Sequence, residues 1–335
     1  LLIPAGCVRQ AMNRHGMAGE PFLFGIDFEM KQGFFIDHPL ENKEILFSIG
    51  EISNVGKDTA LLSTPSTMLS GFDGPQLRVF PMPFEEYRSR FAIAHAGLLR
   101  GDSYLLNLTL RTPISTNLSL EQIFCRSKAA YRICLPGRFV CFSPESFVRI
   151  EGSSIRSFPM KGTIDASLPE AEKQLMGNYK EQCEHYTIVD LIRNDLNRIA
   201  ANVRVERFRY IEKVKSRQGE ILQSSSEIRG TLPGNWNENV GDLIFGLLPA
   251  GSISGAPKSS TVRLIQKAEA KPRGFYTGVF GLFDGISLDS AVMIRYIEQD
   301  GENRMYFRSG GGLTINSQAE DEYREVIQKI YLPII

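Results

Sequence analysis

One lysine, Lys161, stands out because it lies in the segment FPMKGT at 158–163, shortly after a proline and directly before a glycine. Proline fixes the approach of the chain, and glycine permits a sharp turn or a close contact with a ligand, so this lysine has little conformational freedom. Upstream, the segment SPES at 143–146 places Glu145 before the strand-like run 147–158. We interpret Lys161 as a nucleophile and Glu145 as an acid acting on one small substrate. The alternative is a surface lysine in a turn.

Two predicted helices each carry a pair of glutamates three residues apart, Glu181 with Glu184 and Glu322 with Glu325. This spacing places both members of a pair on one face of the helix. If the two faces meet, the dense negative patch is costly without a hard cation, and carboxylate oxygens suit magnesium. The pattern therefore predicts a Mg²⁺ site. The alternative is two solvated glutamate pairs on helix surfaces.

A further group of residues could hold an anionic ligand. The glycine-rich segment PAGSISGAPK at 249–258 lacks the spacing of a nucleotide-binding P-loop, but its backbone N–H groups could hold a carboxylate. Three glycines at 310–312 follow a predicted strand, Arg295 lies inside an apolar strand, and Tyr276 adds a hydroxyl. Together they suggest a ligand with two carboxylates, one held by the metal and one by the arginine and backbone amides. Taken singly, these features also fit a bulge, an arginine that extends to solvent, or a core tyrosine.

Size and composition are those of an ordinary globular protein. The 335 residues are 42% hydrophobic and 23% charged, which allows one large domain or two smaller ones. A formal net charge of zero, without a long basic run, argues against nucleic acid or an anionic membrane as a partner. No apolar run approaches the roughly 20 residues of a membrane span, and the opening segment is too short for a secretory signal. Five scattered cysteines without metal-finger spacing suggest reduced thiols and a cytoplasmic location.

Hydrophobic periodicity and turn residues predict the elements that position these groups. Strands come in adjacent groups rather than in strict alternation with helices, which favours an α+β fold. The segments SLPE at 167–170 and SQAE at 317–320 have the pattern of a capping box at a helix start. No repeat or low-complexity linker divides the chain, so we expect one domain over 1–335, with a shortened N-terminal sheet portion at 1–84 and a core at 85–332. Predicted helices cover 84–99, 120–130, 167–194, 237–248 and 260–270, and predicted strands cover 20–80 in part, 104–110, 147–158, 203–214, 226–232, 276–283, 290–298 and 304–309.

Several motifs in order resemble those of the chorismate-utilising enzymes, a family that includes anthranilate, aminodeoxychorismate, isochorismate and salicylate synthases. The resemblance spans about residues 85–332 and implies two packed, mostly antiparallel sheets flanked by helices, with magnesium-dependent chemistry on chorismate. It rests on EHYTIVDLIRND at 184–195, PAGSISGAPK at 249–258, GFYTGVFG at 274–281, Ile294-Arg295 and the glycines at 310–312.

A few positions distinguish the branches of this family. Anthranilate synthases carry alanine where Lys161 stands, whereas aminodeoxychorismate synthases carry lysine in the pattern P-I-K-G-T. The branch that adds water uses a lysine where this chain has Leu105, and aminating members usually have glutamine there, so this chain departs from both. Gln223 stands where many members have a histidine linked to loss of pyruvate. The resemblance therefore implies the aminodeoxychorismate synthase component I reaction, a transfer of ammonia to chorismate in p-aminobenzoate and folate biosynthesis.

The resemblance also implies roles for individual residues. Lys161 would add to C2 of chorismate while Glu145 protonates the departing C4 hydroxyl, and burial with the nearby cation should lower the pKa of Lys161. Glu184 and Glu325 would bind Mg²⁺, with Glu181 and Glu322 acting directly or through water. The enolpyruvyl carboxylate would be held by Tyr276, Arg295, Gly311 and Gly312, and the same pocket would be lined by Ser254 and Lys258.

The sequence bears on the source of ammonia and leaves two alternative functions open. The chain contains no G-x-C-x-G nucleophile elbow, so ammonia would come free from solution or from a separate glutamine amidotransferase subunit. Anthranilate synthase component I is the enzymatic alternative. The non-enzymatic alternative is a catalytically silent chorismate-binding subunit.

Overall fold

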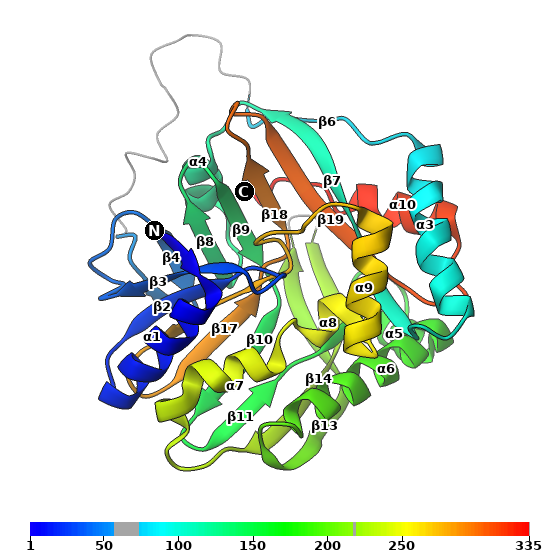
Figure 1. Ribbon diagram of the computed structural model, residues 1–335. Coiled ribbons are helices and arrows are strands. Elements are labelled where there is room, and N and C mark those ends of the chain that lie inside the picture. The colour runs from blue at the N-terminus through cyan, green and yellow to red at the C-terminus, as the bar shows by residue number, and fades with distance from the viewer. Residues whose placement is uncertain (57–73, 217–218, 335) are drawn as a thin grey trace.

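The computed structural model describes residues 1–56, 74–216 and 219–334, which build two antiparallel β-sheets with helices around them (Figure 1). Within these residues the first sheet contains ten strands, and the paired strands run antiparallel. Its order is β1 (Leu2–Pro4), β3 (Gln32–Asp37), β2 (Phe22–Ile26), β16 (Val279–Phe283), β17 (Leu288–Val292), β10 (Ser146–Glu151), β11 (Ser154–Ser157), β14 (Gly219–Thr231) and β12 (Met160–Asp165), with β13 (Ala201–Ser216) also paired to β14.

The second sheet has nine strands in the described part of the chain, again with antiparallel pairs. The α+β fold predicted from the grouping of strands is confirmed, and so are the two mostly antiparallel sheets flanked by helices that the resemblance implies. The order is β15 (Gly255–Ala256), β7 (Leu105–Thr116), β19 (Met305–Leu313), β18 (Tyr296–Gln299), β9 (Phe139–Ser143), β8 (Tyr131–Leu135), β4 (Leu46–Ile49) and β5 (Ile52–Ser53), with β6 (Leu77–Val79) also paired to β7.

The helices have the lengths and apolar faces expected of surface helices that pack on a sheet. In α3, the buried positions Tyr87, Phe91, Ala94 and Leu98 recur at intervals of three or four residues and form one face. The helices are α1 (Ala5–Ala18), α3 (Phe84–Leu99), α4 (Leu120–Arg126), α5 (Ala171–Gly177), α6 (Tyr179–Leu196), α7 (Val240–Leu247), α8 (Gly251–Ser254), α9 (Lys258–Glu269) and α10 (Ala319–Gln328), with the 3₁₀ turn η1 (Trp236–Asn239) before α7.

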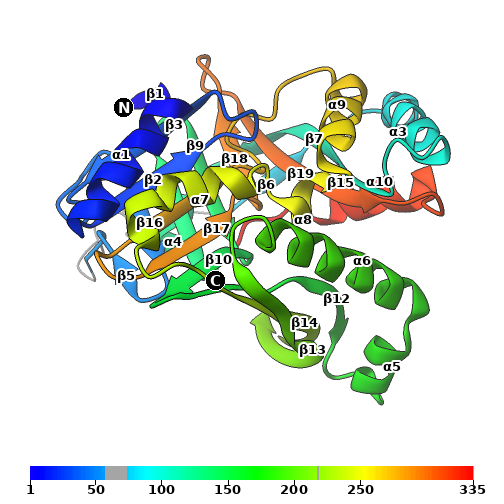
Figure 2. The ribbon, with the colours of Figure 1, turned by 60° about the horizontal axis from the view of Figure 1, so that its bottom comes forward.

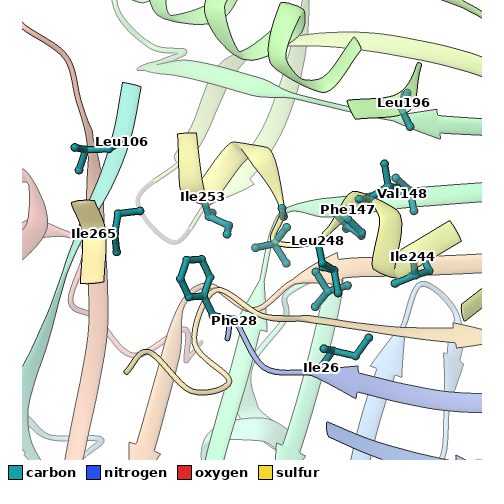
Figure 3. Close-up of a cluster of buried hydrophobic side chains, with 14 of the residues drawn as sticks. Ile26, Phe28, Leu106, Phe147, Val148, Leu196, Ile244, Leu248, Ile253 and Ile265 are labelled. Atoms are coloured by element: carbon teal, nitrogen blue, oxygen red, sulfur yellow. The ribbon is translucent and has the colours of Figure 1, made fainter. Parts of the chain in front are cut away.

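Buried apolar clusters join these layers. Phe34 and Phe280 of the first sheet share a cluster with Phe47 and Phe139 of the second sheet, which places a core between the two sheets. The largest cluster joins both sheets to the helices. Figure 3 shows Ile253 of α8 and Phe28 directed toward each other within it. Burying a side chain such as Ile253 contributes about 1.5–3 kcal/mol, so this contact anchors the short helix α8.

Two of the predicted helix starts are wrong. The predicted helix at 167–194 is two helices, α5 and α6, separated at Asn178, whose side chain accepts a hydrogen bond from Glu181 N. The Ser167 hydroxyl donates to Asp165 instead of capping a helix. The α10 helix likewise begins without a side-chain cap, because the Ser317 hydroxyl donates to Glu322 Oε1. In both segments a carboxylate competes with the backbone for the serine.

Two predicted strands and one helix also differ from expectation. The predicted strand 147–158 is a hairpin of β10 and β11 that turns at Gly152, where φ is +54°. The predicted strand 290–298 is interrupted between β17 and β18 by Arg295, whose φ is also +54°. The predicted sheet over 20–80 falls partly on residues 57–73, which lie outside the described residues. Helix α1 was not predicted.

Two further features concern membrane-spanning helices and the cysteines. Within the described ranges, none of the helices combines the length and hydrophobicity that a membrane-spanning helix needs. All five cysteines are free.

Candidate active site

A cavity of about 180 Å³ brings together four of the residues that the sequence singled out. Lys161, Glu145, Tyr276 and Arg295 all line it, although they come from segments far apart in the chain. Lys161 lies on β12, Glu145 between β9 and β10, Tyr276 before β16, and Arg295 between β17 and β18. The cavity is therefore the candidate active site.

The position of Lys161 is set by an irregularity in the sheet. The register between β12 and β14 shifts between Met160 and Thr163, and Gly162 within this shift has a φ of +79°. Such a bulge redirects the side chain next to it, and glycine adopts this backbone conformation without strain. The Lys161 Nζ atom lies 2.7 Å from Glu184 Oε2, and 29% of the lysine side chain is exposed.

The charge of Lys161 differs from the sequence-based expectation. Burial lowers the pKa of Lys161, as predicted, but the neighbouring carboxylates of Glu184, Glu181 and Glu325 outweigh burial and hold the pKa above its ordinary value. The protein alone therefore keeps this amine protonated. The prediction of a lowered pKa is wrong for the protein without a bound cation, because it left out three nearby negative charges.

The environment of Glu145 favours the protonated carboxyl group more than water does. Burial raises the pKa of Glu145, although the hydrogen bond from the Ser252 hydroxyl to Oε1 and the charge of Lys161 oppose this effect. Its backbone N–H donates to Ser143 Oγ at 3.0 Å, and its carbonyl accepts from Val292 N at 3.2 Å, which fixes the loop that carries it. Glu145 is thus held on the cavity wall as a group able to donate a proton.

The four glutamates approach Lys161 from two helices. Glu181 and Glu184 lie near the start of α6, and Glu322 and Glu325 lie on α10. Figure 2 shows α6 running below α10. Since Glu181, Glu184 and Glu325 all influence the pKa of Lys161, carboxylates from both helices lie close to this amine.

The α10 glutamates lie against the triple-glycine strand. A Cβ atom at Gly311 would lie 3.2 Å from Glu322 Oε2 and 3.9 Å from Glu325 Oε1, so this position leaves little room for a side chain. Glu322 is 4% exposed and accepts a hydrogen bond of 2.7 Å from the Ser317 hydroxyl. Glu325 pairs with Lys329 Nζ at 2.6 Å. The close backbone approach predicted for the glycines therefore has a physical cause in these carboxylates.

This donor set can be compared with the needs of magnesium. Its carboxylate oxygens are of the kind that Mg²⁺ prefers, and they come from two facing elements. Among the described residues, however, no group of three His, Cys, Asp or Glu side chains is close enough to hold a metal ion. Ammonium groups of Lys161 and Lys329 contact Glu184 and Glu325 instead. The residues fit Mg²⁺ by chemistry, and the metal site stays a prediction.

Arg295 and Tyr276 offer hydrogen-bond donors to an anion. Arg295 donates from Nη1 to the Lys329 carbonyl at 3.2 Å, and its guanidinium lies 5.3 Å from the centre of the Tyr331 ring. It has no carboxylate partner within 4.0 Å in the described part of the chain, although it borders the cavity. Tyr276 is 3% exposed, and burial raises its pKa to about 12, so its hydroxyl stays a donor.

Gly312 lies close to the lysine, but two other predicted residues lie elsewhere. A Cβ atom at Gly312 would lie 3.8 Å from Lys161 Nζ. The Ser254 hydroxyl is fully buried and donates to the Ala250 carbonyl at 2.8 Å. Lys258 Nζ donates to Asp195 Oδ2 at 2.9 Å and to the Leu247 carbonyl at 2.7 Å. Ser254 and Lys258 therefore hold the glycine-rich turn in place and do not line the cavity.

Sequence reasoning missed six polar residues that border the cavity: Asn107, Ser252, Thr277, Arg308, Ser309 and Lys329. Of these, Ser252 lies in the glycine-rich segment that was singled out, and Asn107 is two residues from the Leu105 position. The Asn107 Oδ1 atom is buried and has no hydrogen-bond partner in the described residues, so it could accept from a ligand.

The two departures from the family pattern have ordinary packing roles. Leu105 is 5% exposed, and its Cδ1 atom would lie 3.5 Å from a Cβ atom at Gly312. Gln223 lies opposite Thr163 in the β12–β14 ladder and donates from Nε2 to Ser225 Oγ at 3.3 Å. Neither side chain is a base, so neither could activate a water molecule.

The arrangement as a whole joins an amine and an acid with donors for anions. It could add a nucleophile to an anionic substrate and protonate the group that leaves. A sequence model of the chorismate binding enzymes matches residues 48–334.

Curated relatives cover the chain to different extents. An uncharacterized PabA-like protein of Haemophilus influenzae is 51% identical over 96% of this chain and 95% of its own length. Aminodeoxychorismate synthase component 1 of Bacillus subtilis is 31% identical over 69% of this chain and 51% of its own length. Anthranilate synthase component 1 of Archaeoglobus fulgidus is 32% identical over 70% of this chain and 57% of its own length. Similarity alone therefore does not separate the two named activities.

A solved structure shares the fold. The menaquinone-specific isochorismate synthase MenF of Escherichia coli superimposes with a TM-score of 0.70 over 96% of this chain and 80% of its own, at 17% sequence identity.

Proposed function

Because the chain belongs to the chorismate binding enzyme family, we propose that it converts chorismate and ammonia to 4-amino-4-deoxychorismate, the reaction of aminodeoxychorismate synthase component 1. The observation that carries this proposal is a lysine amine, Lys161, that lines the same cavity as a carboxyl group with a raised pKa, Glu145. An amine nucleophile and a proton donor are the two groups that exchange of a hydroxyl at C4 requires.

Lys161 first loses its extra proton to solvent, and the free amine Nζ then forms a bond to C2 of the ring. Both ring double bonds shift, and the C4–O bond breaks as Glu145 gives its proton to the departing oxygen, so water leaves. Hydroxide without a proton is a poor leaving group, which is why the acid is required. The raised pKa of Glu145 supports this role, because burial keeps a larger fraction of the carboxyl group protonated.

The second step restores the ring and the enzyme. Ammonia attacks C4, both ring double bonds shift back, and the C2–N bond to Lys161 breaks. The proton lost from ammonia returns to Glu145, which is then ready for another cycle. The net reaction is chorismate plus ammonia giving 4-amino-4-deoxychorismate plus water, and the amine and the acid are both regenerated.

Residues around the cavity would hold the two carboxylates of the substrate. Arg295 and the Tyr276 hydroxyl would donate to the enolpyruvyl carboxylate, together with the amides near Gly311 and Gly312. Mg²⁺ held by Glu184 and Glu325, with Glu181 and Glu322 directly or through water, would neutralise the acidic side of the cavity and bind the ring carboxylate.

Ammonia would come from a glutamine amidotransferase subunit or from solution. The chain has no G-x-C-x-G elbow with which to hydrolyse glutamine itself. A partner that supplies ammonia next to the cavity would keep the amine unprotonated until it reaches C4.

Anthranilate synthesis is the second candidate, since a 32% identical relative carries that name. Two residues favour amination at C4. Lys161 occupies a position where alanine suffices for anthranilate formation, and Gln223 cannot act as the base that removal of pyruvate requires. A silent chorismate-binding subunit would have no need for Lys161 and Glu145 in one cavity.

The test supplies the purified chain with chorismate, Mg²⁺ and ammonium at alkaline pH. Production of p-aminobenzoate after addition of a 4-amino-4-deoxychorismate lyase supports the proposal. Anthranilate, which fluoresces directly, would establish the second candidate. Chorismate binding without either product would establish the silent subunit.

A further inference from the structure

A second cavity, of about 290 Å³, lies next to the candidate active site. It forms where α3, the end of α9 and the β7–β19 strand pair meet, elements that Figure 1 shows beside one another. Arg308 borders both cavities and, among the residues that the structure describes, is the one lining residue that they share. Arg111 lies directly opposite Arg308 in the β7–β19 ladder, so both guanidinium groups lie on the same face of the sheet.

The charges around this second cavity do not balance. The carboxylate of Glu298 accepts from the Nε atoms of both Arg111 and Arg308, so one negative charge faces two positive charges. The terminal amino groups of these two arginines make no hydrogen bond within the described residues. Lys271 also lines the cavity, is exposed, and has no ion-pair partner in the part of the chain that the structure describes. Two positive charges are therefore uncompensated.

The other charged groups on the wall are already paired. Arg90 is paired with Glu86 at 2.8 Å. Glu269, which is 5% exposed, accepts from Arg273 and from Thr109 N, so it adds no free negative charge. These paired groups therefore do not reduce the excess positive charge of the second cavity.

One buried hydroxyl in the wall lacks a partner. Thr109 is 2% exposed and lines the second cavity, and its Oγ1 atom has no hydrogen-bond partner in the described residues. A buried hydroxyl without a partner is costly, so a group that bonds to it is expected. The guanidinium of Arg111 lies 3.5 Å from the centre of the Tyr306 ring, which holds it in place beside this hydroxyl.

We propose that the second cavity binds a small organic carboxylate between Arg111, Arg308, Lys271 and the Thr109 hydroxyl. The planar guanidinium groups match the two oxygens of a carboxylate, and Met82 and Tyr306 provide apolar surface for its carbon skeleton. This binding stands apart from the proposed function, since none of these residues takes part in the amination steps.

The test is a calorimetric titration of malonate into the full chain without magnesium or ammonia, so its outcome does not depend on amination. Lys271→Glu reverses one charge in the wall and is expected to weaken malonate binding by about tenfold or more, a change of about 1.4 kcal/mol. Lys267→Glu is the matched control, because it makes the same change at an exposed lysine of α9 that does not line the cavity. This control is expected to leave the affinity unchanged.

A third variant separates the two cavities. Arg295→Gln alters the candidate active site and is expected to leave malonate binding unchanged, because Arg295 does not line the second cavity. Undetectable malonate binding, equal affinities in Lys271→Glu and Lys267→Glu, or a loss confined to Arg295→Gln would overturn the proposal. A chorismate titration then identifies the source. If the wild-type chain binds a second molar equivalent of chorismate that Lys271→Glu does not bind, the substrate itself uses the site. If the wild-type chain binds no second equivalent, the site serves a separate carboxylate. Both of these results uphold the site.

Discussion

Replacement of Glu145 by glutamine removes the proposed acid but keeps the size of the side chain. Glutamine can still accept the hydrogen bond that the Ser252 hydroxyl donates. General acid catalysis contributes about 10²–10⁴-fold to a rate. We therefore expect kcat for amination to fall by that factor, which corresponds to about 2.7–5.5 kcal/mol of barrier. The KM for chorismate should change little, because the proton is transferred only in the transition state.

The pH profile of this variant adds a second readout. Burial raises the pKa of Glu145, while the Ser252 hydrogen bond and the charge of Lys161 limit the rise. Only the protonated form acts as an acid, so its contribution is complete below this pKa and is lost as the pH rises through it. At constant concentration of free ammonia, kcat of the wild-type chain should fall on the alkaline side. The glutamine variant should lack this fall.

The assay couples amination to p-aminobenzoate formation and varies pH at constant free ammonia. Glu151→Gln is the matched control, since Glu151 lies at the end of β10, is exposed, and pairs only with Arg156 at 3.4 Å in the described residues. A Glu145→Gln variant that retains kcat within about threefold of wild type would refute the assignment, because the expected loss is at least about 10²-fold. An unchanged alkaline limb in that variant would refute it as well.

Three further variants test the metal site, the glycine-rich turn and the triple-glycine strand. Glu184→Gln should raise the Mg²⁺ concentration for half-maximal activity by roughly tenfold or more. Even substitutions of residues that only support a metal ligand weaken metal affinity by about 10–100-fold. An unaltered metal dependence would count against this site. Lys258→Met leaves Asp195 without the cation that lies 2.9 Å away, so the free energy of unfolding in denaturant should fall by about 3–5 kcal/mol. The KM for chorismate should stay unchanged. A rise in KM without any loss of stability would show that Lys258 contributes to chorismate binding in the cavity. Gly310→Ala places a Cβ atom 2.9 Å from the Leu108 carbonyl and 2.8 Å from Asn107 Oδ1, so thermal unfolding should show a loss of about 1–3 kcal/mol. A variant as stable as wild type would show that the strand tolerates a side chain there.

Several features of the fold follow from sequence patterns alone. Helix α3 was predicted with its observed bounds, because Tyr87, Phe91 and Leu98 recur at helical spacing between Pro83 and Gly101. The long helix after the candidate lysine was predicted without its break at Asn178. A residue that caps a new helix can equally lie inside one, and only the local contacts decide.

The candidate site likewise has features that the sequence reveals and features that it does not. Lys161 and Glu145 could be found because proline and glycine residues and the two ends of the strand-like run 147–158 mark their positions. Ser252 could not be separated from Ser254, since both hydroxyls lie in the four-residue helix α8, and its orientation is set by the burial of Ile253. The pKa of Lys161 depends on carboxylates that come from α6 and α10. Such long-range contacts leave no trace in the residues next to the lysine.

The most direct test of the account replaces Lys161 by alanine and measures both chorismate binding and production of 4-amino-4-deoxychorismate. Lys173→Ala, at a lysine whose side chain is 77% exposed, is the matched control. The account predicts that the Lys161 variant binds chorismate with nearly unchanged affinity and loses amination almost completely, while the control keeps both. An alanine variant that aminates chorismate at the wild-type rate would contradict it.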